Sequence, residues 1–160
     1  MWLTDDAFRT VIASTPLFSI DLIIRNTEGN LLLGRRTNRP AQGSWFVPGG
    51  RIMKNETLDK AFERLTLVEL GLAVSRDLAV LLDLYQHFYD DSVFGDTPDT
   101  HYVVAGYLLD LSDPSMLNLP PSQHSEFKWW SPSAMLNDVN VHSHSRDYLA
   151  ALAKHPRKGL

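Results

Sequence analysis

The alternation of apolar and polar residues along the chain predicts a strand-rich domain with one long central helix. Apolar runs of strand length occur at residues 17–25, 31–34, 78–90, 101–111 and 126–130. A short polar turn separates the first two runs, which predicts a β-hairpin. A loop rich in Asp, Gly and Pro separates the third and fourth runs, which predicts an antiparallel pair.

The central helix is predicted from apolar residues that recur at three- and four-residue spacing after the second run. They are Leu58, Ala61, Phe62, Leu65 and Val68. Thr57 or Asn55 can cap the start of this helix, and Gly71 stands where a C-terminal cap glycine belongs. Shorter helices are predicted around residues 8–12, after residue 131 and around residues 148–153. This order of elements is typical of an α+β fold in which helices cover a mixed sheet.

Length and composition narrow the class of protein further. The 160 residues are expected to form a single domain, residues 1–160. No apolar run approaches the ~18 residues of a membrane span, and the N-terminal residues do not resemble a secretory signal, so no membrane partner is expected. The chain has no cysteine, which agrees with a reducing compartment and a cytoplasmic location. A net charge of −4 argues against a nucleic-acid partner.

Basic residues nevertheless gather in one part of the chain. Arg25, Arg35, Arg36, Arg39 and Arg51 are five of the 15 Lys and Arg residues. Three of them lie in a predicted polar loop, residues 35–44, which precedes a glycine pair, Gly49 and Gly50, predicted to close a turn. Arginine recognises phosphate and carboxylate groups through paired hydrogen bonds, so this loop is expected to capture an anion.

A motif of glycine, glutamate and arginine surrounds the central helix. Its residues are Gly50, Glu56, Arg64, Glu69, Gly71 and Leu72, in the spacing Gly-x5-Glu-x7-Arg-x4-Glu-x-Gly-Leu. This spacing resembles the signature of the Nudix hydrolase family, which has two further glutamates where this chain has Leu65 and Val68. Those two positions share one helix face with Glu69. Because only one carboxylate remains on that face, we expect one bound metal ion rather than a cluster.

The resemblance is closest to the GDP-mannose mannosyl hydrolases, the Nudix subgroup with this altered signature. It extends through the segments TNRPAQGSWFVPGGR, QHFYDD, THYVV and QH, and so covers nearly the whole chain. It implies a Nudix-like α/β/α sandwich with a central mixed sheet, and a homodimer. The implied reaction is metal-dependent hydrolysis of GDP-mannose, or of GDP-glucose, to GDP and free sugar.

The expected cofactor is one Mg²⁺ or Mn²⁺ ion. Glu69 supplies a carboxylate, and a glycine turn lets the backbone carbonyl of Gly49 approach the ion closely. The resemblance adds the amide oxygen of Gln123. Arg64 is expected to support the helix and the turn through Glu56 rather than to contact the substrate.

The bond expected to break joins the anomeric carbon of the sugar to the diphosphate, with inversion at that carbon. A diphosphate neutralised by a metal ion and by Arg51 leaves readily, so a catalytic acid is not required. His124, on a predicted loop beside Gln123, is the expected base, since histidine titrates near neutral pH. Arg36 and Arg51 are expected to hold the diphosphate. Asp21 would support positive charge on the sugar, although a carboxylate within an apolar strand is more often satisfied by neighbouring donors.

The resemblance also places further residues at the substrate: Trp2, Leu3, Phe8, His87 and Tyr102. Trp2 has two interpretations: packing at the terminus, which composition favours, or stacking on a nucleobase across a dimer interface, which the resemblance favours. The remaining histidines are expected to be structural or surface groups: His101, His142, His144 and His155.

Two alternatives remain open. One is a Nudix pyrophosphohydrolase that cleaves a P–O bond of a nucleoside diphosphate derivative. The other is a degenerate Nudix domain that binds a nucleotide without hydrolysing it, which the presence of Glu69, Gln123 and His124 disfavours. The sequence also leaves open whether the sugar is mannose, glucose or fucose, and whether the base is guanine.

Overall fold

The computed structural model describes residues 2–120 and 124–157. The strands are β1 (Leu17–Arg25), β2 (Leu31–Arg36), β3 (Trp45–Phe46), β4 (Gly49–Arg51), β5 (Val80–Tyr89), β6 (Thr100–Asp110) and β7 (His124–Trp130). The helices are α1 (Asp5–Ser14), α2 (Leu58–Leu70), α3 (Pro132–Asn137), α4 (Ser143–Arg146) and α5 (Tyr148–Leu152), with 3₁₀ turns at Arg76–Leu78 and Pro114–Met116. No helix within these two ranges is long and apolar enough to cross a membrane.

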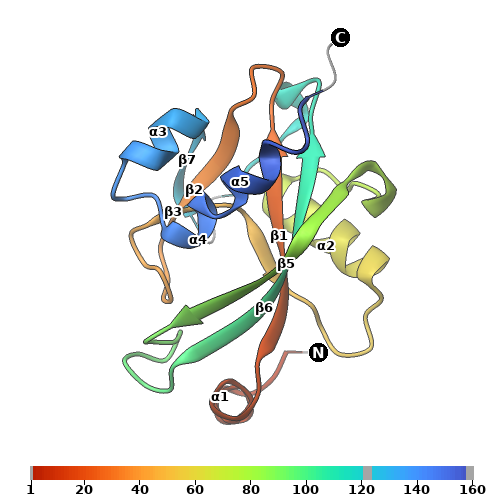
Figure 1. Cartoon of the computed structure of the whole chain (residues 1–160). Helices are drawn as coiled ribbons and strands as arrows, with labels where there is room; N and C mark the ends of the chain where they lie inside the picture. Colours follow the sequence, from red (N-terminus) through yellow and green to blue (C-terminus); the bar gives the residue numbers. More distant parts are fainter. Residues whose placement is uncertain (1, 121–123, 158–160) are drawn as a thin grey trace.

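The strands form one mixed sheet in which β1 is central (Figure 1). The main path runs β3-β2-β1-β6-β5, and β4 and β7 join it by pairing with β1 and β2. β1 and β6 are parallel, whereas the other pairs are antiparallel, including the predicted hairpin and the predicted β5–β6 pair. The prediction of an α+β fold with a mixed sheet is therefore confirmed.

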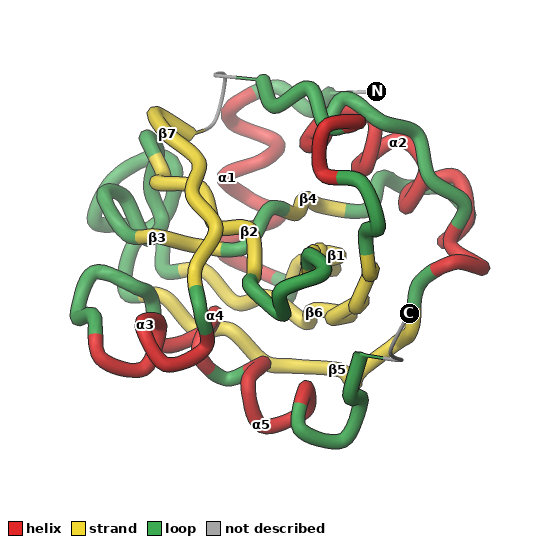
Figure 2. The backbone as a smooth tube through the Cα atoms, turned by 90° about the horizontal axis from the view of Figure 1, so that it is seen from above, coloured by secondary structure: helices red, strands yellow, loops and turns green. Residues whose placement is uncertain are grey.

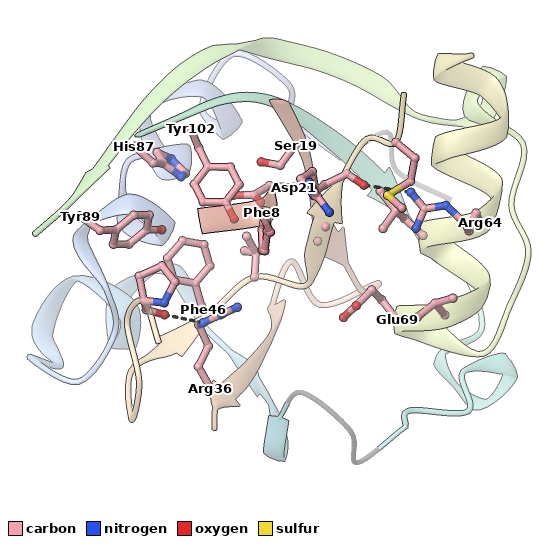
Figure 3. Close-up of a pocket in the computed structure, with 18 of the residues that line it drawn as sticks. Phe8, Ser19, Asp21, Arg36, Phe46, Arg64, Glu69, His87, Tyr89 and Tyr102 are labelled. Atoms are coloured by element: carbon pink, nitrogen blue, oxygen red, sulfur yellow. Dashed lines mark hydrogen bonds between the residues drawn. The ribbon is translucent and has the colours of Figure 1, made fainter. Parts of the chain in front are cut away.

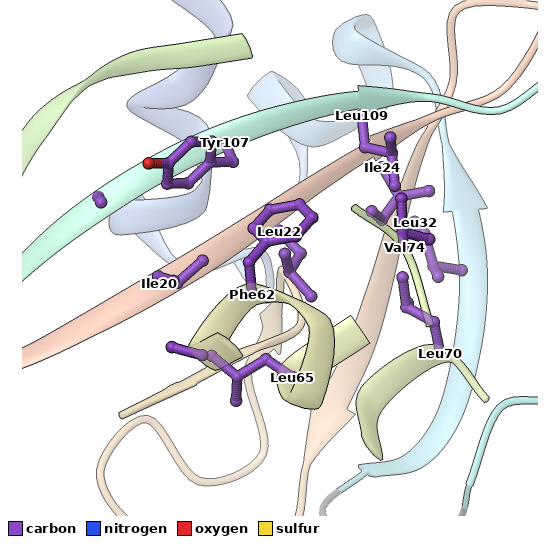
Figure 4. Close-up of a cluster of buried hydrophobic side chains, with 12 residues drawn as sticks. Ile20, Leu22, Ile24, Leu32, Phe62, Leu65, Leu70, Val74, Tyr107 and Leu109 are labelled. Atoms are coloured by element: carbon purple, nitrogen blue, oxygen red, sulfur yellow. The ribbon is translucent and has the colours of Figure 1, made fainter. Parts of the chain in front are cut away.

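Helices cover both faces of the sheet, with α1 and α2 on one side and α3, α4 and α5 on the other (Figure 2). Under α2, Ile20 and Leu22 of β1 pack with Phe62 and Leu65 (Figure 4). Because side chains alternate along a strand, Ile23 belongs to a second buried cluster beneath the C-terminal helices. Burial of each such side chain contributes about 1.5–3 kcal/mol. These two clusters fix α2 and the C-terminal helices against the same central strand.

The α2 helix begins and ends where the sequence predicts. The Thr57 hydroxyl accepts a hydrogen bond from the Lys60 amide at 3.2 Å, and Gly71 has a left-handed φ of 69°. The buried apolar stripe is shorter than predicted at both ends, because Leu58 is 42% exposed and Val68 is 48% exposed. Val68 follows the buried Leu65 by about one turn and lines a cavity instead of the core.

Three predictions about loops are wrong. β2 continues through Arg36, so Arg35 and Arg36 belong to a strand. The glycine pair belongs to β4, which pairs with β1 and is not a turn. His124 begins β7 instead of ending a loop. In the case of β4, the reason is a close approach of two backbones: a Cβ on Gly49 would overlap the carbonyl oxygen of Ile20 and lie only 3.1 Å from Cα of Asp21, so glycine is required there.

Candidate functional site

A cavity of about 390 Å³ is formed by residues of the N-terminal segment, the sheet and α2 (Figure 3). Its volume lies within the roughly 300–1,000 Å³ typical of small-molecule sites. Nine of the residues expected at the site line it: Trp2, Phe8, Asp21, Arg36, Gly49, Arg51, Glu69, His87 and Tyr102. The fold therefore brings together side chains that the sequence distributes over about a hundred positions.

The other expected residues lie elsewhere. Leu3 and His124 are not among the lining residues, and Gln123 lies outside the described residues. The His124 ring is buried 5.1 Å from that of Phe127, in space left by Gly34, where a side chain would overlap the imidazole. Its Nε2 has no hydrogen-bond partner among the described residues. The functional roles assigned to these three residues stay predictions.

Glu69, in the last turn of α2, offers a buried carboxylate. It is 4% exposed, and no hydrogen bond or ion pair with another described residue holds it. Burial raises its pKa to about 7, which the nearby positive charge of Arg36 opposes. Leu65 and Val68 line the cavity beside it, and within the described ranges no cluster of three or more His, Cys, Asp or Glu side chains could hold a metal ion. A buried carboxylate without a protein partner suits a single cation.

The backbone carbonyl of Gly49 is the second oxygen donor that could bind a cation. Asp21 and Gly49 lie opposite each other in the β1–β4 pair. In an antiparallel ladder, hydrogen-bonded and non-hydrogen-bonded residue pairs alternate. Leu22 N donates to Pro48 O (2.8 Å) and Ile52 N donates to Phe18 O (2.9 Å), so these two pairs are hydrogen-bonded. Asp21 and Gly49 are therefore a non-hydrogen-bonded pair, so the Gly49 carbonyl points away from β1. Together with the Glu69 carboxylate, it gives the oxygen donors that Mg²⁺ or Mn²⁺ prefers.

Asp21 is the second buried carboxylate of the cavity, at 6% exposure. The Tyr148 hydroxyl of α5 donates a hydrogen bond to its Oδ2 at 2.5 Å. Burial raises the pKa of Asp21 to about 7, although the hydrogen bond from Tyr148 and the charge of Arg36 both lower it. The expectation of a neighbouring donor for Asp21 is thus confirmed. The donor itself was not foreseen, because Tyr148 lies 127 residues away in the sequence.

Two arginines bring positive charge to the cavity. Arg36, at the end of β2, donates from Nε to the carbonyl of Pro40 at 2.9 Å. The Arg51 guanidinium lies 4.3 Å from the centre of the Phe8 ring and makes no hydrogen bond or ion pair with the described residues. Each keeps donors available, so the pair can bind an anionic group.

Arg64 and Glu56 hold the turn between β4 and α2, as expected. Arg64 donates to both carboxylate oxygens of Glu56, at 2.6 and 2.9 Å, and to the carbonyl of Arg51 at 2.9 Å. Glu56 also accepts from the Met53 amide at 2.9 Å. These bonds lower the pKa of Glu56 and keep it charged. The ion pair thus fixes the backbone that carries Arg51.

Behind the cavity wall, His87 belongs to a group of rings that the sequence does not indicate. The His87 ring stacks on that of His144 at 4.1 Å, and His142 lies 4.6 Å from His144. Burial, followed by the two neighbouring imidazoles, lowers the pKa of His87 to about 3. His142 and His144 are therefore structural supports of the site. Tyr89 also lines the cavity, and its two-residue spacing from His87 was a usable signal.

Comparison with known proteins identifies the family to which the chain is similar. The family model of the NUDIX domain matches residues 15–152. The chain is 38% identical over 150 residues to the Low-salt glycan biosynthesis protein Agl8 of Haloferax volcanii, covering 94% of this chain and 90% of that protein.

Solved structures show the same fold. A MutT NUDIX hydrolase from Burkholderia pseudomallei has a TM-score of 0.69 at 26% identity, covering 87% of this chain and 99% of that one. A bifunctional NMN adenylyltransferase/ADP ribose pyrophosphatase from Francisella tularensis, complexed with AMP and an Mn ion, has a TM-score of 0.63 at 20% identity and covers 88% of this chain and 42% of that one. Since the family model matches most of the chain and the cavity is lined by the signature helix, the chain belongs to the Nudix family.

Proposed function

We propose that this Nudix hydrolase converts GDP-mannose, or a related GDP-hexose, to GDP and free sugar by attack of water at the anomeric carbon. The observation that carries the proposal is the apolar wall beside Glu69. Leu65 and Val68 line the cavity at the two signature positions where glutamates would gather further metal ions. A site with one such carboxylate is poorly equipped for metal-clustered attack at phosphorus, and better suited to release of an intact diphosphate. The name of the Haloferax relative, a glycan biosynthesis protein, supports a substrate that contains a sugar.

Nudix hydrolases generally use divalent metal ions, and the residues present fit one. Glu69 and the Gly49 carbonyl would hold Mg²⁺ or Mn²⁺, and the resemblance adds Gln123. An ion bound there would neutralise part of the diphosphate charge and make it a better leaving group. The chain's own contribution is two oxygen donors, the buried Glu69 carboxylate and the backbone carbonyl of Gly49.

Arg36 and Arg51 bind the diphosphate, and their attraction grows as the bond to the sugar lengthens and negative charge moves onto the leaving oxygen. Asp21 supports the positive charge that develops on the sugar ring. Its pKa near 7 leaves a large ionised fraction at neutral pH, and the hydrogen bond from Tyr148 favours that charged form.

His124 is the proposed base. Burial and the charge of Arg36 lower its pKa to about 4, so its imidazole is neutral and able to accept a proton at neutral pH. Its unpartnered Nε2 is also free to do so. Since the His124 ring lies outside the set of lining residues, variants must test it against Asp21 and His87, two titratable groups that do line the cavity.

The rival function is a pyrophosphohydrolase, in which water attacks phosphorus. It is favoured by one observation: the Francisella protein of the same fold is named as an ADP ribose pyrophosphatase. The products separate the two reactions. Attack at carbon gives GDP and mannose. Attack at phosphorus that cleaves the bond between the two phosphates gives GMP and mannose 1-phosphate.

Hydrolysis of GDP-mannose in oxygen-18 water tests the proposal. The label should appear in mannose and not in GDP, and the first-formed sugar should be the β anomer. His124→Gln should lower kcat by about 10²–10⁴-fold, as expected for loss of a general base, with His155→Gln as a matched control. Label in GMP or mannose phosphate would establish the rival reaction. Full activity of His124→Gln would move the base assignment to Asp21 or His87.

A further inference from the structure

We propose that Phe94, in the loop between β5 and β6, is a positioning residue for Arg51, and that Arg9 supports it from outside. The inference rests on the proposed function, since it assigns Arg51 to the diphosphate. Phe94 is not among the residues that line the cavity, so it acts through other side chains. The proposed effect is to hold the Arg51 guanidinium at the cavity wall before the anion arrives.

The geometry is a stack in which two aromatic rings lie between two guanidinium groups. The Arg51 guanidinium lies 4.3 Å from the centre of the Phe8 ring. Phe8 meets Phe94 edge to face, with ring centres 5.8 Å apart. The Arg9 guanidinium lies 4.4 Å from the centre of the Phe94 ring. Each of these contacts falls within the range in which such pairs attract.

The stack joins three separate parts of the chain. Arg51 belongs to β4, Phe8 and Arg9 to α1, and Phe94 to the loop that follows β5. Figure 1 shows α1 lying beside the end of the β5–β6 hairpin that carries this loop. Of the four residues in the stack, only Arg51 and Phe8 line the cavity. The remaining two members therefore form a support behind them.

A ring is a suitable support for an anion-binding arginine. Ordering a long side chain has an entropic cost, which binding must otherwise meet. A carboxylate could order Arg51, but it would also neutralise the charge and occupy the donors that a diphosphate needs. The Phe8 ring holds the guanidinium by its face and leaves the N–H groups free. Arg36 has a different arrangement, since one of its donors is bound to Pro40.

The loop that carries Phe94 is itself held in place. Ser92 and Gly95 exchange two backbone hydrogen bonds of 2.9 and 3.1 Å. The Thr100 hydroxyl donates to the Asp91 carbonyl at 2.7 Å, and Arg39 pairs with Asp96 at 2.7 Å. The first two contacts fix the base of the loop from which the Phe94 ring projects. The third is an exposed ion pair, so its removal provides a control.

The test is a double-mutant cycle on anion binding. GDP and, separately, inorganic pyrophosphate are titrated calorimetrically in the presence of Mg²⁺ into the parent protein, Phe94→Leu, Arg51→Ala and the double variant. Phe94→Leu keeps apolar volume but lacks the ring that meets Phe8 edge to face, so it should weaken binding by about three- to tenfold in the parent. It should have no further effect once Arg51 is replaced. Phe94→Tyr keeps the ring face and should restore binding, and Asp96→Asn should bind as the parent does.

Three results would overturn the inference. They are unchanged binding by Phe94→Leu, an equal loss with and without Arg51, and failure of Arg51→Ala to weaken either anion. The surface variant Arg9→Gln removes the charge that lies over the Phe94 ring, and it should give a smaller loss in the same direction.

If GDP-mannose is not hydrolysed but the coupling is found, the proposed function fails and the positioning role stands. If hydrolysis is found without coupling, the reverse holds.

Discussion

Replacement of Tyr148 by Phe tests how the protein keeps Asp21 charged. The substitution removes one hydroxyl and leaves the ring, which packs edge to face on Tyr85 at 4.7 Å. That hydroxyl is the donor to Asp21 at 2.5 Å and favours the ionised carboxylate. Its loss leaves burial unopposed by this hydrogen bond, so the pKa of Asp21 should rise.

The size of the shift follows from the strength of the bond. A hydrogen bond to a charged group contributes about 1.5–3 kcal/mol, and one pKa unit corresponds to about 1.4 kcal/mol. The pKa should therefore move from about 7 by about one to two units. At pH 7.5 the ionised share of Asp21 should fall from about three quarters to about one tenth. If the charged form is required for catalysis, kcat should fall by about the same factor and recover at higher pH.

The pKa is measured by carbon-13 NMR of aspartate side-chain carboxyls in metal-free protein, with Asp21→Asn to assign the signal. The pH dependence of kcat with GDP-mannose gives the second readout. Tyr85→Phe is the matched control, because it changes the neighbouring ring without touching the hydrogen bond. An unshifted or lowered pKa in Tyr148→Phe, or an equal shift in Tyr85→Phe, would refute the reasoning.

Three further outcomes are expected. Glu69→Gln should weaken Mn²⁺ binding and lower activity with little change in the circular dichroism spectrum, and an unchanged Mn²⁺ titration would contradict its role as ligand. Arg51→Ala should lower kcat more than it raises KM, because its attraction grows as the diphosphate leaves; a pure KM effect would limit it to binding. The pKa of His87 is lowered from 6.5 to about 3, so the unfolded chain binds a proton there that the folded chain does not. The contribution of His87 to stability should therefore fall as the pH drops below about 6.5, by up to ~1.4 kcal/mol per pH unit, and urea unfolding of His87→Gln should show a shallower decline than the parent.

Long periodic segments could be predicted from the sequence because their signals are local. Alternation located the five longer strands, and the cap residues Thr57 and Gly71 located both ends of α2. β3 and β4 were missed, since strands of two and three residues have no period to detect. They exist because β1 and β2 offer unpaired edges to a passing backbone, which is a property of the fold and not of the segment.

The residues of the candidate site likewise fall into those that a local sequence pattern marks and those that none does. Glu69 could be located because the signature fixes its spacing, and Gly49 and Arg51 could be located because they flank the signature glycine, Gly50. Tyr148 and Phe94 could not be found, because each acts on a residue far away in sequence and neither has a local pattern that marks it. Burial of His124 was also beyond the sequence, since it depends on the space above Gly34 in a different strand.

The parallel pairing of β1 with β6 also bears on how the site comes into being during folding. Its partners, such as Leu17 and Tyr102, lie 85 residues apart. Closure of so long a loop is slow, because chain entropy is lost before the contacts form. Gly49 and Glu69 lie inside the loop, whereas Asp21 and Tyr102 lie on the two strands that close it. An intermediate with α2 formed and β1 and β6 unpaired would contain the signature helix and lack the cavity. Nucleotide binding during refolding should therefore appear after the helical signal and report the closing of the central strands.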